Sequence, residues 1–201
     1  MPTPGPCLAL LCALVLSGAA CHAPARAARP ILVPSDTVDR PVARPPYDRV
    51  APSWKDRQAQ PYVYVELVGP YARGADRLDV VLEAMRAQGL EPAGPPFGLY
   101  YDDPGRVPAT ELRSRACVPI QAPREVTAPL RCDVLAGQTV VYAFVAGKAD
   151  ELPRAYPALF DYLERLRWVE DGPLREVYLV PPPGRAPDEL LAEIQVPARA
   201  R

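Results

Sequence analysis

Hydrophobic and polar positions follow no sustained period before about residue 62, and a regular one after it. From there, short apolar runs of strand length alternate with amphipathic stretches of helical period. The first four predicted elements are a strand, a helix and two strands, at 62–68, 78–89, 97–101 and 111–119. The helix presents four apolar residues at i, i+3, i+4 and i+7, namely Leu78, Val81, Leu82 and Met85. Gly89 is placed to end this helix.

Four more elements follow in the same order. They are a strand, a helix and two strands, at 139–146, 153–166, 175–180 and 189–197. The apolar stripe of this second helix consists of Tyr156, Leu159, Phe160, Leu163 and Leu166. Because proline is tolerated only in the first turn of a helix, Pro157 sets the start of the helix near 153 or 154.

The order strand, helix, strand, strand therefore occurs twice. Both closing strands begin with Glu-Leu and reach Val-Pro at the same spacing, which favours an internal duplication. Residues 121–130 link the two copies, and 130–135 form an additional predicted strand. We expect an α+β fold built from a duplicated β-α-β-β module. Its antiparallel sheet would carry two helices on one face and a ligand groove between the repeats.

Charge and composition remove several classes of function. The chain has 23 basic and 24 acidic residues and a net charge of −1, so it lacks the positive field that non-specific nucleic-acid binding needs. Its one histidine, His22, lies outside the globular part. This argues against zinc sites, haem ligation by histidine and Ser-His-Asp catalysis. No cofactor is expected.

The N-terminus has the character of a targeting segment. Residues 7–20 form an apolar stretch that is long enough for a signal-peptide core and too short to span a membrane. Gly18-Ala19-Ala20 before Cys21 resembles a bacterial lipobox, which would make Cys21 the lipidated first residue of the mature protein. Residues 23–25 and 25–27 offer A-x-A sites for ordinary signal peptidase instead. The segment before residue 7 has no lysine or arginine, and the alternatives to export are a mis-assigned start codon or a cytoplasmic chain with a disordered apolar leader.

Three regions follow from these patterns. We expect a signal peptide at 1–21, a tether rich in Pro, Ala and Arg at 22–60, and the globular domain at 61–201. The alternative for the end of the tether is that Tyr47 and Trp54 pack back on the domain. The expected location is the cell envelope, with the domain held to a membrane through Cys21 and facing the periplasm.

Several motifs resemble the GyrI-like small-molecule-binding family, whose domain serves as the effector-binding module of AraC-type and MerR-type regulators. The motifs are the run Gly94 to Pro104, Glu111-Leu112-Arg113, Ala116-Cys117-Val118, Glu151-Leu152-Pro153 and the ending Glu193-Ile194-x-Val196-Pro197. The resemblance covers about 140 residues and is specific in combination.

The resemblance implies a pocket at the seam of the two repeats that binds flat, apolar and often cationic compounds. Aromatic walls and an acidic residue are expected there, and some proteins of similar fold hydrolyse electrophilic toxins. The first repeat keeps the family's Gly69-Pro70-Tyr71, whereas the second has Gly147-Lys148-Ala149. The Pro-rich segment cannot form a helix-turn-helix.

Glu193 is the candidate pocket carboxylate, mainly because of the resemblance. It lies in an otherwise apolar strand, on the opposite face from Ala192, Ile194 and Val196. There it would pair with a ligand cation or polarise a water molecule. A residue that faces solvent or pairs with an arginine on a neighbouring strand is the alternative.

The candidate aromatic walls are Tyr101, Tyr178 and Phe97. Strand aromatics are commonly half-buried packing residues, so each also has a purely structural interpretation. Adjacent Tyr100 and Tyr101 must point to opposite faces, so at most one of them enters a given pocket. Trp168 either caps the pocket or fills the core.

The remaining candidates have weak signals. Cys117 and Cys132 are the only cysteines of the domain; export would permit a disulfide between them, whereas the resemblance implies that Cys117 is a buried free thiol. Asp102-Asp103 lacks the clustered ligands that a metal site needs and is interpreted as a solvated turn. No nucleophile with a matching base is present, so no catalytic residue is assigned.

The leading hypothesis is an exported, non-catalytic domain that captures hydrophobic, cationic or amphipathic molecules. The second is a hydrolase of electrophilic toxins, in which Glu193 and a tyrosine activate water. The third is a structural or partner-binding lipoprotein whose pocket is vestigial.

Overall fold

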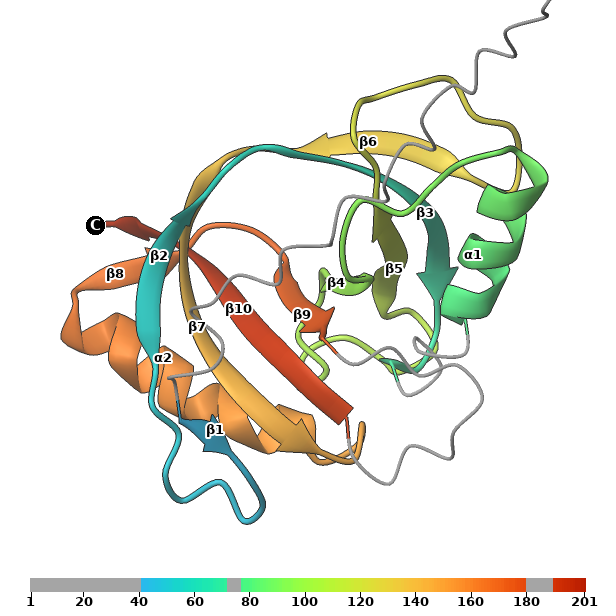
Figure 1. The fold of residues 1–201 in the computed structure, drawn as a ribbon. Coiled ribbons are helices and arrows are strands. Elements are labelled where there is room, and N and C mark those ends of the chain that lie inside the picture. Colours follow the sequence, from blue (N-terminus) through green and yellow to red (C-terminus); the bar gives the residue numbers. More distant parts are fainter. Residues whose placement is uncertain (1–40, 72–76, 180–189) are drawn as a thin grey trace, which may run out of the picture. The chain divides into compact units, whose positions relative to one another are not determined.

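One ten-stranded sheet organises the described part of the chain, which comprises residues 41–71, 77–179 and 190–201 of the computed structural model (Figure 1). These residues belong to the larger of two units into which the chain divides, 33–201. The predicted signal peptide, including Cys21, and most of the predicted tether lie outside the described residues. No helix among the described residues is both long and apolar enough to cross a membrane.

The elements follow the chain as β1 (Val42–Ala43), β2 (Ser53–Arg57), β3 (Gln60–Val68), α1 (Leu78–Ala87), β4 (Phe97–Tyr100), β5 (Arg113–Pro119), β6 (Arg131–Leu135), β7 (Gln138–Gly147), the 3₁₀ turn η4 (Leu152–Ala155), α2 (Tyr156–Arg165), β8 (Trp168–Glu170), β9 (Leu174–Tyr178) and β10 (Leu190–Ala200). The strand order is β1-β7-β10-β9-β4-β5-β3-β6, while β2 pairs with β7 and β8 with β10. All pairings are antiparallel except β1 with β7. The expected α+β class, with a large sheet and two helices, is confirmed.

Both helices cover the same face of the sheet. Directly paired residues of neighbouring strands share a face, and the register joins Ala116, Gly98, Glu176, Ile194 and Ala143 in one row from β5 to β7. Helix α1 packs at the β5 end of this row and α2 at the β7 and β10 end. The helix-covered face therefore extends continuously across the sheet.

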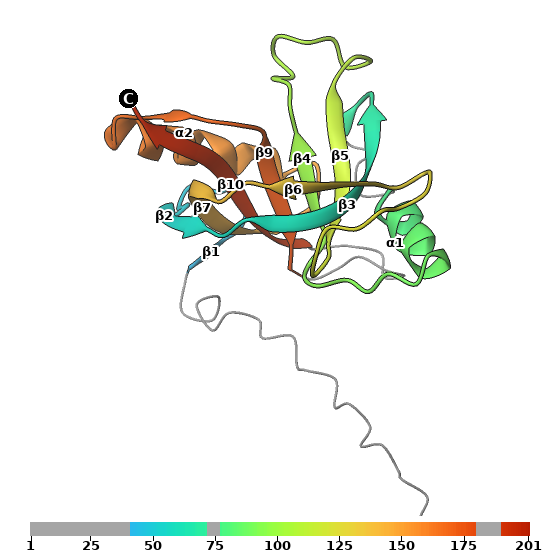
Figure 2. The same ribbon diagram turned by 90° about the horizontal axis from the view of Figure 1, so that it is seen from above.

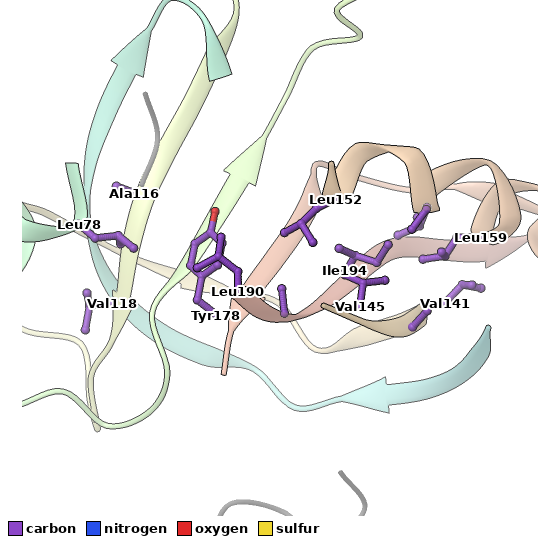
Figure 3. Packing of buried hydrophobic residues seen from close by; sticks show 14 of the residues in the cluster. Leu78, Ala116, Val118, Val141, Val145, Leu152, Leu159, Tyr178, Leu190 and Ile194 are labelled. Atoms are coloured by element: carbon purple, nitrogen blue, oxygen red, sulfur yellow. The ribbon is translucent and has the colours of Figure 1, made fainter. Parts of the chain in front are cut away.

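The main core lies between this face and the helices (Figure 3). Val81 and Met85 of α1 are buried there, as are Leu159 and Leu163 of α2. These are positions of the two predicted apolar stripes. Full burial of such a side chain contributes roughly 1.5–3 kcal/mol. Gly89, with φ of +63°, ends α1 in a conformation that favours glycine.

The sheet begins earlier than the sequence-based boundary at residue 60 (Figure 1). Strand β2 pairs with β7 over five residues, and β1 adds to the other end of β7. The alternation in β2 was not visible as a strand signal because its better-buried positions are Ser53, Lys55 and Arg57 rather than apolar residues. The end of the predicted tether therefore packs on the domain, as the alternative for Tyr47 and Trp54 had it: Tyr47 is buried and Trp54 contacts Trp168.

Tyr47 fixes the segment between β1 and β2. Its side chain is buried, and its hydroxyl donates a hydrogen bond to the carbonyl of Ala146 at 3.3 Å. Gly147 leaves room for this contact, because a β-carbon there would collide with the Tyr47 hydroxyl. The glycine is needed for close approach of the N-terminal segment to β7.

The two cysteines of the domain are free. Cys117 and Cys132 lie on β5 and β6, which flank β3 on opposite sides. Their partners on β3 are the consecutive residues Tyr64 and Val63, so the two thiols point to opposite faces. A disulfide between them is excluded, and burial raises the pKa of the Cys117 thiol well above its ordinary value.

Candidate functional site

A cavity of about 580 Å³ opens where the loop after β4 meets η4, α2 and β9. Figure 2 shows β4 and β5 projecting toward that loop, with α2 alongside β10. Six aromatic residues line it, namely Tyr71, Tyr100, Tyr101, Tyr156, Phe160 and Tyr178. The acidic lining residues are Asp102, Asp103, Asp150, Glu170 and Glu176, and no lysine or arginine is found among the described lining residues.

Glu176 is the buried carboxylate of this cavity. Its Oε1 accepts a hydrogen bond from the Tyr156 hydroxyl at 3.0 Å. Its Oε2 lies 3.1 Å from the Tyr100 hydroxyl and 3.2 Å from that of Tyr178. The Tyr100 and Tyr178 hydroxyls are also 2.8 Å apart, so one of them donates to the other while both remain close to the carboxylate.

Burial governs the electrostatics of this group. Desolvation raises the pKa of Glu176 above its ordinary value, although the three tyrosine hydrogen bonds oppose that rise. The same burial, together with the Glu176 charge, raises the pKa values of Tyr100, Tyr156 and Tyr178. The tyrosines therefore stay neutral. Tyr156 and one hydroxyl of the Tyr100–Tyr178 pair donate to the carboxylate, while the other hydroxyl of that pair donates to its neighbour.

Strand geometry brings these groups together. Glu176 and Tyr178 are two residues apart on β9 and so share the helix-covered face. Gly98 of β4 stands directly opposite Glu176. A β-carbon on Gly98 would lie 2.8 Å from the Tyr100 hydroxyl, so the glycine leaves the space through which that hydroxyl reaches Glu176.

A second set of contacts shapes the loop after β4. The Tyr71 hydroxyl lies 2.8 Å from the Asp102 carbonyl and accepts the Asp102 backbone N–H at 3.0 Å, and its ring meets that of Tyr100 edge-on at 4.9 Å. Asp102 accepts hydrogen bonds from the guanidinium and the backbone N–H of Arg113, both at 2.7 Å, and these contacts lower its pKa. The Asp102 carboxylate is therefore occupied by Arg113 and holds the loop after β4 in place.

The other acids lie at the exposed part of the cavity. Asp103 contacts Arg106 at 3.3 Å in a solvent-exposed pair. Burial, followed by the nearby charge of Asp103, raises the pKa of Glu170. No described residue forms an ion pair with Asp150 or Glu170. The lining thus combines aromatic surface with an excess of negative charge.

The structure separates the five residues that the sequence had grouped as ligand-binding. Tyr101 and Tyr178 line the cavity. Phe97 lies on the opposite face of the sheet, packed against Tyr62 with the Arg175 guanidinium 5.0 Å from its ring centre. Trp168 stands outside the cavity lining and meets Trp54 edge-on at 5.7 Å.

Glu193 also lies outside the cavity lining. It is buried on the face away from the helices, where Lys55 of β2 approaches its carboxylate at 2.7 Å and the Gln195 amide donates at 2.6 Å. The carboxylate of the cavity is instead Glu176, which the sequence analysis did not single out. A signal was present, because the choice of Tyr178 as a wall places Glu176, two residues earlier, on the same face.

Comparison with known proteins identifies the class. The sequence matches the GyrI-like small molecule binding domain over residues 51–199, and the chain belongs to this family. The resemblance expected from the motifs is therefore confirmed. No curated protein matches the sequence significantly.

Solved structures agree on the fold. The C-terminal domain of EcmrR is similar, with a TM-score of 0.65 and 18% identity over 76% of this chain and 99% of that domain. EcmrR in an EcmrR–DNA complex gives a TM-score of 0.65 at 19% identity, over 76% of this chain and 58% of that one. A hydrolase from Listeria innocua gives 0.53 at 11% identity, over 82% and 96% of the two chains.

The Glu193 ion pair provides a test that separates stability from binding. Glu193→Ala leaves Lys55 without its partner, and because Lys55 is partly solvated we expect a loss of about 2 kcal/mol in the free energy of unfolding. Asp171→Ala, which removes an exposed pair with Arg199, should cost no more than about 1 kcal/mol. Urea unfolding measures both. Glu193→Gln should leave the affinity for a small-molecule ligand of the cavity unchanged, and a large loss of affinity with an intact fold would show that Glu193 belongs to the binding site.

Proposed function

We propose that this protein binds small hydrophobic organic cations in the cavity above Glu176. The observation that carries the proposal is the Glu176 carboxylate, buried below three tyrosine hydroxyls in a cavity whose described lining is aromatic and acidic without lysine or arginine. A carboxylate in such surroundings attracts a positive charge strongly, because little water screens it.

The size and walls of the cavity agree with a compact aromatic or aliphatic ligand. A volume of about 580 Å³ falls within the roughly 300–1,000 Å³ that is common for small-molecule sites. Aromatic faces attract cations through the ring quadrupole, so the tyrosines add to the attraction of the carboxylate. Leu174 and Leu190 supply apolar surface for the body of the ligand.

The proposal includes an origin for the cavity in a duplicated β-α-β-β module, with the ligand held between the repeats. Two observations support it. The order β3-α1-β4-β5 returns as β7-α2-β9-β10, with β8 added. The cavity lining draws on both halves, from Tyr71 to Pro104 and from Ala149 to Leu190.

We further propose that binding takes place in the cell envelope, after export and lipidation at Cys21. The apolar stretch at 7–20 and the small residues before Cys21 support this location. The intact mass of the protein recovered from bacterial membranes is expected to correspond to a chain that begins at Cys21 and carries lipid. A mass that matches the full chain from Met1 without lipid would contradict export and lipidation. It would not bear on the proposal that the cavity binds a ligand.

Glu176→Gln tests the binding role directly. The substitution keeps the shape of the side chain, replaces one acceptor oxygen by an NH2 donor and removes the charge, so affinity for a quaternary ammonium probe should fall about 10- to 100-fold. Isothermal titration measures the change, and Glu193→Gln, a buried glutamate on the neighbouring strand, is the matched control. Equal affinity of wild type and Glu176→Gln would refute the role. Hydrolysis of an ester or strained-ring substrate that is lost in Glu176→Gln would favour the hydrolase hypothesis instead.

The raised pKa of Glu176 predicts the pH dependence of binding. A permanently charged ligand binds the ionised carboxylate, so affinity should rise as pH increases from the ordinary glutamate pKa of 4.5 through the higher folded-state value. In the same window the ligand-free protein should lose stability, because the folded state holds this proton more tightly than the unfolded state. Titrations and thermal unfolding at several pH values measure both trends. Both trends should be weaker in Glu176→Gln, where the raised pKa of Glu170 still contributes in the cavity, and an affinity that falls with rising pH would contradict the assignment.

A further inference from the structure

The two tryptophans of the chain form one pair at the surface, Trp54 on β2 and Trp168 on β8. Trp54 is 49% exposed, and Trp168 is half-buried. Their strand partners are Val141 and Ala200, so both indoles point to the helix-covered face, beyond the C-terminal end of α2. The core of the domain therefore leaves much of the Trp54 ring in contact with solvent.

A shallow groove of about 440 Å³ lies between the segment that leads into β2 and the outer side of α2. Its lining consists of three apolar and three charged residues, namely Val50, Pro52, Ala158, Asp161, Glu164 and Arg165. Pro52 is two residues before Trp54, and Arg165 is three residues before Trp168. The groove therefore ends close to the tryptophan pair.

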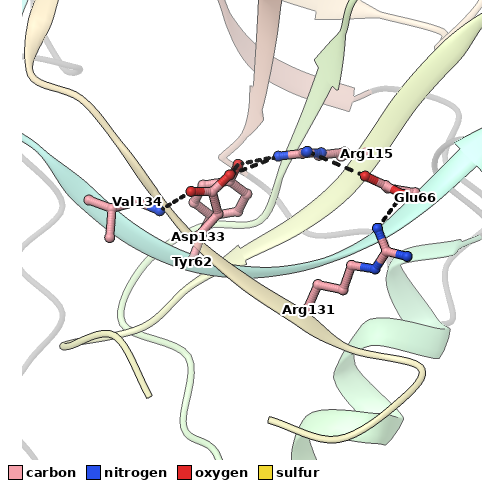
Figure 4. A network of polar contacts seen from close by, with 6 residues as sticks. All are labelled: Tyr62, Glu66, Arg115, Arg131, Asp133 and Val134. Carbon is pink, nitrogen blue, oxygen red and sulfur yellow. Dashed lines mark hydrogen bonds and ion pairs between the residues drawn. The ribbon is translucent and has the colours of Figure 1, made fainter. Parts of the chain in front are cut away.

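The charged side chains of the groove form no ion pair with another described residue, although Asp161 and Arg165 are one helical turn apart. The face away from the helices is different. There Arg115 pairs with Glu66 at 3.3 Å and with Asp133 at 3.1 Å, in a network on β3, β5 and β6 (Figure 4). The charges of the groove, unlike those of this network, are available to a partner that carries both signs of charge.

The proposed lipid anchor would hold the groove and the tryptophan pair near a bilayer. Strands β1 and β2 pair with the same edge of β7, so the chain that follows Cys21 joins the sheet at the edge that carries Trp54. Residues 22–41, which separate Cys21 from β1, span at most about 70 Å when fully extended. Contact with the bilayer is then intramolecular, and an effective concentration on the order of millimolar makes weak contacts sufficient.

The chemistry of this surface matches the headgroup layer of a phospholipid bilayer. Tryptophan is enriched at that depth, because its ring is apolar and its N–H needs a polar partner. A guanidinium binds phosphate, and carboxylates attract the ammonium group of choline or ethanolamine. With two acids and one arginine, the groove suits a zwitterionic headgroup better than an anionic one.

We propose that the groove and the tryptophan pair together form a docking surface for a bilayer of zwitterionic phospholipid. The proposal rests on the proposed export and lipidation, and it adds the orientation of the domain on the membrane. Both indoles lie in the headgroup layer of the docked protein. Arg165 contacts lipid phosphate, while Asp161 and Glu164 contact the ammonium groups.

Tryptophan fluorescence reports on this surface directly, because the chain has no other tryptophan. The protein recovered from bacterial membranes is reconstituted in phosphatidylcholine vesicles. Its emission should shift to shorter wavelength, and phosphatidylcholine brominated near the headgroup end of its acyl chains should quench it. Unchanged emission without quenching would overturn the docking surface.

Vesicles of phosphatidylglycerol test the choice of headgroup. The shift and the quenching should both be smaller there by about threefold or more, because this lipid offers no ammonium group to the two acids. Equal or stronger effects on phosphatidylglycerol would overturn the zwitterionic assignment.

A double variant tests the acids of the groove. Asp161→Asn combined with Glu164→Gln should lower the ratio of docked to undocked domain on phosphatidylcholine about three- to tenfold, as measured by the quenching. The matched control is Asp79→Asn combined with Glu83→Gln, two exposed acids of α1, which should keep the ratio. An unchanged ratio in the groove variant, or an equal loss in the α1 variant, would overturn the role of the two acids.

Three readouts keep this inference distinct from the proposed function. Glu176→Gln should be quenched like the wild type, and a loss of quenching there would assign the vesicle contact to the cavity and overturn the docking surface. The affinity of the cavity for the quaternary ammonium probe is measured without vesicles. If the recovered protein carries no lipid, it is titrated with the same vesicles; quenching then supports the surface without an anchor, and its absence overturns the surface.

Discussion

The hydrogen-bonded carboxylate of Glu176 is the interaction on which the arrangement of the cavity depends. Three tyrosines from β4, α2 and β9 converge on one buried acid, and no described lysine or arginine forms an ion pair with it. A buried charge of this kind is tolerated only when its oxygens accept enough hydrogen bonds. Gly98 and the first turn of α2 are the local features that let the donors reach it.

Under the proposed function, this arrangement opposes ligand binding to folding stability at Glu176. Desolvation makes the ionised form of Glu176 costly in the empty protein, and the same desolvation strengthens its attraction for a ligand cation. A pocket optimised for stability alone would hold a neutral amide or an apolar side chain at this position. Retention of an acid is therefore better explained by a ligand than by the fold.

The sequence predicted the elements whose buried positions are apolar and missed those whose buried positions are polar. Both helices and the strands from β3 to β10 were visible, apart from the three-residue β8, because apolar positions mark their buried faces. Strand β2 was not, since Lys55 and Arg57 face inward there. The ion pair between Lys55 and Glu193 could not be foreseen either, because Lys55 lies in the segment that the sequence analysis assigns to the tether. Without this partner in view, Glu193 was taken as the cavity acid. Tyr101 and Tyr178 do line the cavity, whereas the convergence of three hydroxyls on Glu176 depends on cross-strand register that no local pattern contains.

The docking of Tyr47 against Gly147 has a practical consequence for anyone who prepares the isolated domain. A fragment trimmed to the family boundary at residue 51 would discard β1 and the buried Tyr47 ring. A fragment that starts at 61 would also lose Lys55 and leave one edge of β7 without a partner. Exposed strand edges of this kind promote aggregation, and a recombinant domain that begins upstream of Val42 keeps β1 and β2 paired along that edge of β7.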